Sequence, residues 1–316
     1  MGFKDKSGDI RIPVQDDHQY MSDCMHFLNS LSGKTSTYKY ALFKAVLDNL
    51  FNVSPDYRLS FSYLAHSFSK MYWNLVCKYE LPQFQSGRKS LIEIQIDTMT
   101  KEEPQIKGVD FDSLRTEVQR EYLSKTEFII AKDVMGALYD ELNGNIYGFS
   151  KEKKEICFSK ASYEFLMRYK SALEDLNYYS WILWMENILK KREKEEGNLA
   201  IKLDESTKRE SLEVYKKDLI LHGDDLRCFY CGKTVTSCHC HMDHFVPWSF
   251  VKDDQIWNLV FSCPHCNESK NNKLPNQSPY LDKLFIRNQH VLHESYEQKL
   301  RRLYQSAQYN GLVLWN

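Results

Sequence analysis

Two pairs of closely spaced cysteines constrain the fold of this chain more than any other feature. Cys228 and Cys231 form one C-x-x-C pair, and Cys263 and Cys266 form another. Each pair can present two thiolates from one tight turn, and two such turns together give the tetrahedral sulfur set that zinc favours. Gly232 follows the first pair, where a turn needs a residue that tolerates positive φ. We therefore expect a four-thiolate zinc site, which is structural because it leaves no open position for chemistry.

The other isolated cysteines do not indicate a disulfide framework. Cys24, Cys77 and Cys157 stand alone in apolar surroundings, which is typical of buried thiols in a reducing cytoplasm. The N-terminal segment lacks the apolar stretch of a secretory signal. No run approaches the roughly 18 apolar residues of a membrane span. We expect a cytoplasmic protein without a membrane partner, in which clustered cysteines bind metal.

A second group of donors lies between the two pairs. Cys238, His239, Cys240 and His241 are consecutive, and neighbouring side chains of an extended chain point to alternating faces. These donors could exchange into the cysteine cage or form a second metal site. The favoured interpretation is that Cys238 and Cys240 pack on one side of a strand while His241 supports the site on the other.

The chain is long enough for two domains. Its 316 residues exceed what one small core needs, and the predicted fold class is α+β, mainly α. A mainly helical domain at 1–205 is assigned to recognition, regulation or partner docking, because it carries no catalytic pattern. The domain at 206–316 holds the cysteine pairs and a C-terminal helix.

Hydrophobic periodicity predicts the elements of the first domain. Apolar residues at three- and four-residue spacing indicate helices, and two short apolar runs around a charged loop indicate a β-hairpin. The segment 91–96 alternates and fits either a strand or the start of a helix. Residues 1–35 are expected to be irregular, and 190–210 to be a solvated helix tail or linker. The predicted helices cover 37–51, 58–79, 110–142 in two pieces, and 160–196. The predicted hairpin covers 143–159.

Net charge gives no support to a dedicated nucleic-acid binder. The formal charge is −1, whereas such proteins are often strongly basic. Phosphate contacts need only a local patch. Seven basic residues stand against three acidic ones from Lys270 to Arg302, so a modest basic face is predicted beside the cysteine-rich segment.

The residues around the second cysteine pair form an ordered pattern. Asp243-His244 is followed by Phe-Val-Pro247, then Asn258-Leu-Val, and the second pair continues as Cys266-Asn267-x-x-Lys270. This pattern resembles the HNH endonuclease family, whose core is a ββα-metal motif. The likeness covers roughly residues 220–285 and is especially close to the HNH domain of the CRISPR RNA-guided effector nucleases. It implies a small zinc-stabilised ββα-metal domain.

The chemistry of Asp243 and His244 fits phosphodiester hydrolysis. An imidazole titrates near neutral pH and can take a proton from the attacking water. A carboxylate is a hard oxygen ligand suited to Mg²⁺ or Mn²⁺, and such a cation neutralises charge on phosphate and leaving group. Adjacent residues on a strand point to opposite sides, so the strand must twist or end nearby. Pro247 is a suitable terminator.

Four further residues receive roles, Asn267 and Asn258 from the resemblance and the other two from their spacing. Asn267 takes the place of the last catalytic metal ligand, where many relatives have His. Asn258 is the middle residue that ties the loop and orients the general base, although by chemistry alone it also fits an ordinary loop asparagine. Lys270 is one helical turn beyond Asn267 and is predicted to contact phosphate. His241 shares a strand face with Asp243, so it either orients that carboxylate or contacts phosphate.

Two pairs of residues near the pattern have simpler interpretations. Asp253 and Asp254 are paired acids that could be metal ligands, but capping or decorating the loop is favoured. Trp248 and Trp257 are expected to pack in the domain, with stacking on a base as the alternative.

The leading hypothesis is a Mg²⁺- or Mn²⁺-dependent DNA endonuclease with structural zinc. The resemblance implies 5′-phosphate and 3′-hydroxyl products and a place in an anti-phage defence or restriction system. One HNH site cuts one strand per engagement, so a double-strand break would call for a homodimer or two events. The alternatives are a zinc-dependent nucleic-acid-binding module without catalysis, and a nuclease subunit that is active only with an ATPase or sensor partner.

Overall fold

The computed structural model contains two compact units, Met1–Arg209 and Glu210–Asn316. The structure describes residues 6–12, 14–29, 34–85, 87–193, 197–207, 212–236 and 239–315.

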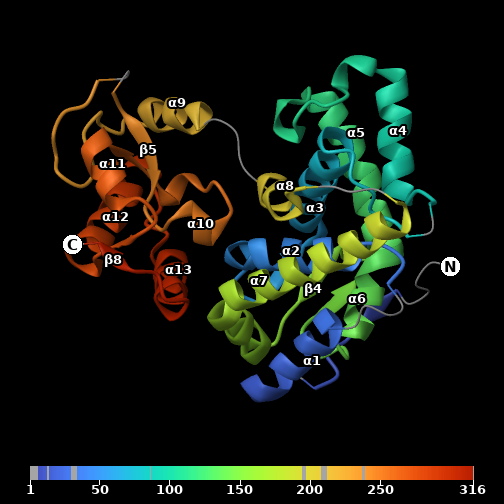
Figure 1. Cartoon of the computed structure of the whole chain (residues 1–316). Helices are drawn as coiled ribbons and strands as arrows, with labels where there is room; N and C mark the ends of the chain where they lie inside the picture. Colours follow the sequence, from blue (N-terminus) through green and yellow to red (C-terminus); the bar gives the residue numbers. More distant parts are fainter. Residues whose placement is uncertain are drawn as a thin grey trace. The chain divides into compact units, whose positions relative to one another are not determined.

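The first unit is a helical assembly with one small sheet (Figure 1). Helix α3 continues into a π-helical turn at Asn74–Lys78, and a second such turn at Ile130–Val134 joins α5 to α6. Short 3₁₀ turns complete the connections. The α-helices are α1 (Asp17–Asn29), α2 (Tyr38–Asp48), α3 (Phe61–Trp73), α4 (Leu91–Glu102), α5 (Thr116–Ile129), α6 (Met135–Glu141), α7 (Lys160–Lys191) and α8 (Leu199–Glu205).

The sheet of the first unit has four antiparallel strands in the order β1-β3-β4-β2. Its centre is the predicted hairpin, in which Phe149 pairs with Ile156. The edge strand β2 comes from a segment expected to begin a helix, so α3 starts three residues later than predicted. The strands are β1 (Ser7–Gly8), β2 (Arg58–Ser60), β3 (Gly148–Ser150) and β4 (Glu155–Cys157).

A capping box decides that residues 91–96 are helical. The Ser90 hydroxyl accepts from the Glu93 amide at 3.3 Å, and the Ser90 amide donates to the Glu93 carboxylate at 2.7 Å. These two bonds satisfy amides that a helix start leaves without partners. The alternating apolar residues therefore sit in α4, and the strand alternative is wrong.

Two helices occupy segments that were expected to be irregular or linker-like. α1 lies within residues 1–35 and buries Tyr20, Cys24, Phe27 and Leu28. That spacing of four, three and one is a helical stripe, but the polar residues between these positions hide it. α8 lies within 190–210 and buries Leu199 and Leu203.

The core of the first unit forms around α2, which is buried on all sides from Tyr40 to Asp48. A charge network lies within this core. The buried Lys44 pairs with Asp48 and, at 2.8 Å, with Glu174 of α7, and Lys170 pairs with Glu174 at 2.9 Å. Buried charges are tolerated when they are paired in this way.

The second unit surrounds a two-stranded antiparallel sheet of β5 and β6 with short helices. A separate parallel pair, β7 and β8, joins the end of the chain to the segment after α11. The elements are α9 (Glu213–Leu221), β5 (His241–His244), α10 (Trp248–Val251), β6 (Leu259–Ser262), α11 (Pro264–Lys270), β7 (Leu274–Pro275), α12 (Gln277–Val291), α13 (Glu297–Tyr309) and β8 (Leu314–Trp315).

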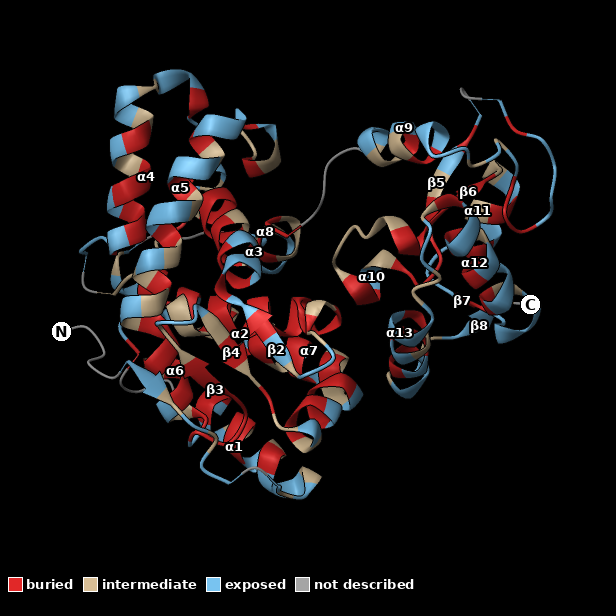
Figure 2. Ribbon diagram, turned by 180° about the vertical axis from the view of Figure 1, so that it is seen from behind, coloured by how far each residue is buried: buried red, intermediate tan, exposed pale blue. Residues whose placement is uncertain are grey.

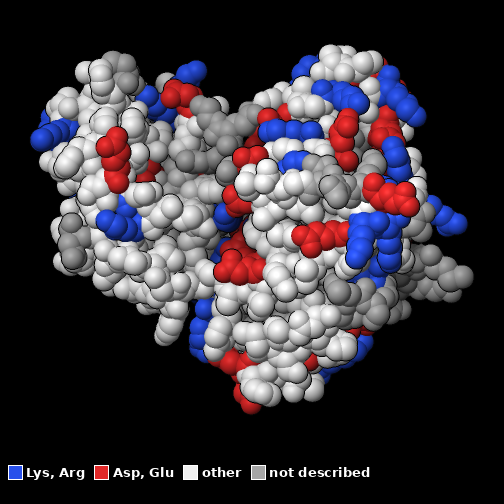
Figure 3. Space-filling model, in the orientation of Figure 1, with Lys and Arg blue, Asp and Glu red and all other residues white. Residues whose placement is uncertain are grey.

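Both units bury apolar side chains on inward faces and leave outer helix faces exposed (Figure 2). The predicted mainly helical α+β class is confirmed. None of the helices in the described residues combines the length and the apolar character that a membrane span needs. On the face in Figure 3, basic and acidic side chains are interspersed over the first unit, as the net charge of −1 suggests.

Candidate active site and metal centre

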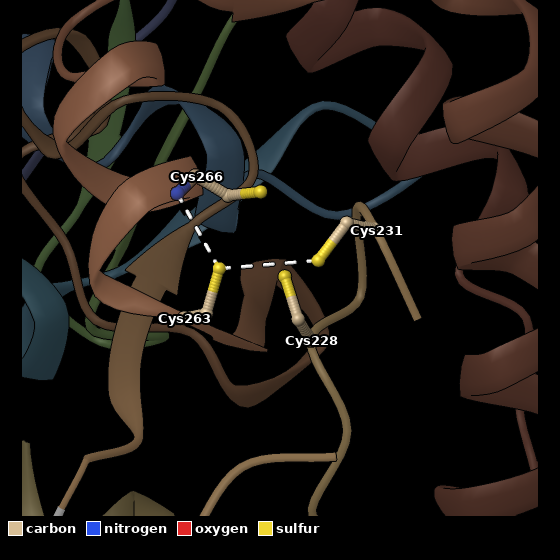
Figure 4. A group of neighbouring side chains, drawn as sticks. All are labelled: Cys228, Cys231, Cys263 and Cys266. Atoms are coloured by element: carbon tan, nitrogen blue, oxygen red, sulfur yellow. Dashed lines mark hydrogen bonds between the residues drawn. The ribbon is translucent and has the colours of Figure 1, made fainter. Parts of the chain in front are cut away.

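The four cysteines of the two pairs converge on one point. Their sulfur atoms all lie within 4.8 Å of one another and turn inward (Figure 4). The sulfurs of Cys231 and Cys263 are 3.9 Å apart. Zinc–sulfur bonds of about 2.3 Å in a tetrahedron place sulfurs about 3.8 Å apart. The cage therefore fits a zinc ion, and its four thiolates would complete the coordination.

Local backbone geometry builds each half of the cage. Gly232 has φ of 74° and donates its amide to the Cys228 carbonyl at 2.8 Å, which closes the first turn. Cys263 is the N-cap of α11, and its sulfur accepts from the Cys266 amide at 3.5 Å. Pro264 occupies the first helical turn, where its missing N–H costs nothing.

One of the two sulfurs of the first turn also favours the thiolate form, whereas burial raises the pKa of the other, Cys231. Burial acts to raise the pKa of Cys228, but backbone hydrogen bonding from Cys231 and Cys263 lowers that pKa to about 7. Zinc binds the thiolate form of cysteine. This sulfur is therefore prepared for the metal near neutral pH.

Tyr230 connects the cysteine cage to the neighbouring strand. It stands between Cys228 and Cys231, and its hydroxyl donates to the carboxylate of Asp243. Burial, and next the Asp243 charge, raise the pKa of Tyr230 well above its ordinary value, so the hydroxyl keeps its proton. Phe229 anchors the same turn by donating its amide to the Phe261 carbonyl at 2.7 Å. The cage thus holds a donor against Asp243.

Strand β5 carries the predicted acid and base. Asp243 pairs with Val260 and His244 with Leu259 across the antiparallel register. Asp243 is 8% exposed and His244 is 3% exposed. Both side chains are thus held in a protein environment, where hydrogen bonds fix their directions.

Lys270 lies under β5 and not on the surface. Its ammonium donates to Asp243 Oδ1 at 3.1 Å, lies 3.0 Å from Oδ2, and donates to the His244 carbonyl at 2.7 Å. The residue is fully buried, and that burial lowers its pKa while Asp243 acts in the opposite direction. The ammonium is thus directed at Asp243 and at the His244 carbonyl, and the phosphate contact of Lys270 stays a prediction.

His244 has a carboxylate partner, Asp254, for which the sequence favoured a role in capping or decorating the loop. Its Nε2 lies 2.9 Å from Asp254 Oδ1. Asp253 supports this loop by accepting the Asp254 amide at 2.9 Å. The sequence offers two adjacent acids ahead of Asn258, and nothing in their order says which one turns toward the histidine.

Asn258 ties the segment after β5 to the start of β6. Its amide oxygen accepts from the Val246 amide at 2.9 Å, and its amide nitrogen donates to the Val246 carbonyl at 2.9 Å. The Asn258 carbonyl also accepts from Phe245 at 2.8 Å. This side chain is fully buried. It fixes the backbone two residues after His244, and it acts on the imidazole only through that backbone.

Asn267 and His241 face each other from α11 and β5. The amide nitrogen of Asn267 lies 3.2 Å from His241 Nδ1. Because this contact uses the nitrogen, the amide oxygen of Asn267 is left for another partner. His241 is exposed, so it remains accessible to solvent. Asp243 and Asn267 together offer oxygen donors of the kind that a small divalent cation takes.

Two of the consecutive donors, His239 and Cys240, are not part of the candidate metal group. Among the described residues, the candidate metal group holds only the four paired cysteines. Cys240 is buried, and its sulfur lies 3.8 Å from the His241 carbonyl. His239 lies 3.0 Å from the Thr236 hydroxyl. Cys238 lies outside the described residues.

Other residues near the site have internal partners. Trp257 is buried and stacks on Tyr296, so it packs as expected. Lys283 donates to the Phe229 carbonyl, and Arg287 to the Leu259 carbonyl. Part of the basic excess after Lys270 therefore serves the fold of the unit, which weakens the case for a phosphate-binding face there.

Comparison with known families identifies one segment of the second unit. Residues 228–276 match the sequence profile of a family described as HNH endonuclease. The matched segment contains the cysteine cage, β5, β6 and α11, and the predicted resemblance to this family is confirmed for these residues. The comparisons found no match among curated proteins or among solved structures.

Proposed function

We propose, from the HNH endonuclease segment in the second unit, that the chain hydrolyses DNA phosphodiester bonds with a divalent cation. The observation that supports this most is the pairing of His244 with Asp254 beside an anchored Asp243. A domain that only binds nucleic acid has no need for an oriented imidazole next to a hard-metal ligand. The arrangement suits activation of a water molecule for attack on phosphate.

The partner of His244 determines which nitrogen would act. An ionised Asp254 can only accept a hydrogen bond, so Nε2 carries the proton and the lone pair is on Nδ1. The carboxylate would also stabilise the imidazolium that forms when Nδ1 takes a proton from water. Asn258 would keep the backbone on this side of β5 in place.

Asp243 and Asn267 would hold Mg²⁺ or Mn²⁺ through their side-chain oxygens. When bound, the ion would offset the charge on the phosphate and the leaving oxygen. Lys270 and Tyr230 already contact Asp243, yet a carboxylate has about four lone-pair sites. These two residues would therefore fix the direction of the carboxylate and leave it able to bind a cation.

The direct test uses a supercoiled plasmid with the purified full chain. We expect nicking with Mg²⁺ or Mn²⁺, none after chelation of these ions, and products with 5′-phosphate and 3′-hydroxyl ends. Nicking by one chain would show single-strand cutting. A concentration-dependent linear product would instead support a homodimer. Binding without cleavage in all metals would favour the zinc-dependent binding module.

The cellular role that we propose is the effector of a defence or restriction system. A nuclease without regulation endangers its host, so the helical first unit suits control or docking onto a sensor or ATPase. Phage plating on cells that carry either the native chain or the His244→Ala chain tests this role. Equal protection by both chains would argue against it.

Replacing Asp254 by asparagine is expected to slow cleavage by about 10- to 100-fold, the usual effect of losing an orienting partner. The amide can present its NH₂ group to Nε2 and favour the other tautomer. Single-turnover plasmid cleavage measures the change, and Asp254→Glu should recover part of the rate. Asp253→Asn is the matched control, and an equal loss there would argue for a general loop defect.

Replacing Tyr230 by phenylalanine is expected to weaken Mn²⁺ binding by about tenfold, because Asp243 loses one of its orienting donors. Titration followed by electron paramagnetic resonance measures this affinity without any cleavage. Zinc content should stay unchanged, since the cysteines remain. Tyr179→Phe, at an exposed tyrosine of the first unit, is the control. Unchanged Mn²⁺ affinity in Tyr230→Phe would show that the hydroxyl has no such role.

A further inference from the structure

A groove of about 940 Å³ lies on the first unit. The start of α3 forms one wall, α5 and the π-helical turn after it form the other, and the β3–β4 turn closes one end. α5 presents an exposed outer face (Figure 2). This volume is typical of ligand-binding clefts, which span about 300–1,000 Å³.

The lining of the groove carries an excess of positive charge. Arg120, Lys132, Lys151 and Lys154 contribute cations, and Glu127 is the single carboxylate among the described lining residues. Glu127 is paired with Lys154 at 2.8 Å. Four basic side chains thus stand against one acidic side chain in the described lining. The groove therefore favours an anionic ligand.

The same groove has an apolar floor with an exposed aromatic ring. Phe61, Ala65 and Leu123 line it, and Phe128 is 66% exposed. The Lys132 ammonium lies 5.9 Å from the centre of the Phe128 ring. A large exposed aromatic residue beside a cation is a combination that accepts a flat ring and a phosphate together.

We propose that this groove binds a single-stranded segment of nucleic acid. Arg120 and Lys132 would contact phosphates, and a base would stack on Phe128. Single strands fit because their base faces are accessible, whereas a duplex hides them between neighbouring pairs. The choice of nucleic acid rests on the proposed nuclease function, and the charge and aromatic pattern specify how it would be held.

The test measures binding of a fluorescein-labelled oligothymidylate of about 20 nucleotides by anisotropy. The full chain carries His244→Ala so that the probe is not cut. Reversing two groove cations in Arg120→Glu/Lys132→Glu is expected to weaken binding at least tenfold. The slope of log affinity against log salt should fall by about 1.4, which corresponds to two lost phosphate contacts. Phe128→Ser should weaken binding about tenfold, as expected for loss of one stacking contact.

Matched variants control for charge and for exposed aromatics. Lys101→Glu/Lys190→Glu makes the same charge change at exposed positions of α4 and α7, outside the groove. Tyr179→Ser removes another exposed aromatic side chain. Circular dichroism confirms that each variant is folded. Equal weakening by the groove and control variants would overturn the proposal, because attraction would then be nonspecific.

Two competitors decide the class of ligand. Unlabelled oligothymidylate should displace the probe much better than a duplex of equal length, and a duplex that competes equally would overturn the single-strand assignment. Polyglutamate that competes as well as the oligonucleotide would point to an acidic protein partner and also overturn it. Unchanged oligothymidylate binding in the groove variants, together with plasmid cleavage by the native chain, would sink this proposal alone. Loss of cleavage with groove binding intact would sink the nuclease function alone.

Discussion

Substitution of His244 by alanine is expected to abolish most DNA cleavage, with a fall of about 10²- to 10⁴-fold in the single-turnover rate. This range is the usual contribution of a positioned general base. The imidazole lies on β5 beside Asp243, with Asp254 2.9 Å from its Nε2, and no described neighbour with a similar geometry could replace it. The rate measurement needs saturating Mn²⁺ or Mg²⁺, so that any change in metal affinity is removed from the comparison.

Two measurements separate loss of the base from loss of the fold. Zinc content should match the native chain, because none of the four cysteines is touched. Mn²⁺ affinity should also be retained, because Asp243 and Asn267 keep their oxygens. His290→Ala, at an exposed position of α12, serves as the matched histidine control. Full activity in His244→Ala would refute its assignment as the base.

Loss of the zinc cage is expected to unfold the second unit and leave the first intact. Structural zinc binding contributes about 10–16 kcal/mol in small zinc domains, which is comparable to or larger than the 5–15 kcal/mol total stability of an ordinary domain. Cys266→Ser removes one thiolate, and the remaining three cannot complete a four-sulfur site. Cleavage should disappear together with zinc content.

Limited proteolysis and thermal unfolding test where the damage lies. Fragments of the second unit should be degraded, while a resistant fragment of the first unit persists with its helical circular dichroism. Cys157→Ser is the control, since this half-buried thiol of β4 lies outside the cage. A Cys266→Ser chain that keeps zinc, stability and cleavage would show that the four sulfurs do not form the proposed site.

The link through Tyr230 gives the cage a second consequence. Tyr230 is held between two cage cysteines and donates to Asp243, so movement of the turn would also move a donor of the carboxylate that we propose as a metal ligand. Partial zinc loss should therefore lower Mn²⁺ affinity before the unit unfolds. This order of events can be followed by titrating a zinc chelator while Mn²⁺ affinity and the unfolding of the second unit are both recorded.

Local features of the fold were accessible from the sequence. The C-x-x-C pairs are short-range patterns, and four thiolates in a tetrahedron are a ligand set that zinc favours. The hairpin at β3 and β4 and the long α7 follow from apolar periodicity. The sequence did not predict α1, because its four buried apolar side chains stand among polar residues. Periodicity is weak evidence for a helix when polar and charged neighbours outnumber the apolar positions.

The sequence by itself determined the cage ligands and the order Asp243, His244, Asn258, Asn267, because adjacent or regularly spaced residues carry their chemistry within a short stretch. Only the tertiary structure decided that Asp254 faces His244, that Tyr230 reaches Asp243, and that Lys270 points inward. These contacts join residues 10 to 27 positions apart. Which side chain turns inward depends on how β5, the loop and α11 pack. Residue type alone does not settle this, because a lysine, tyrosine or aspartate can stand on either face of an element.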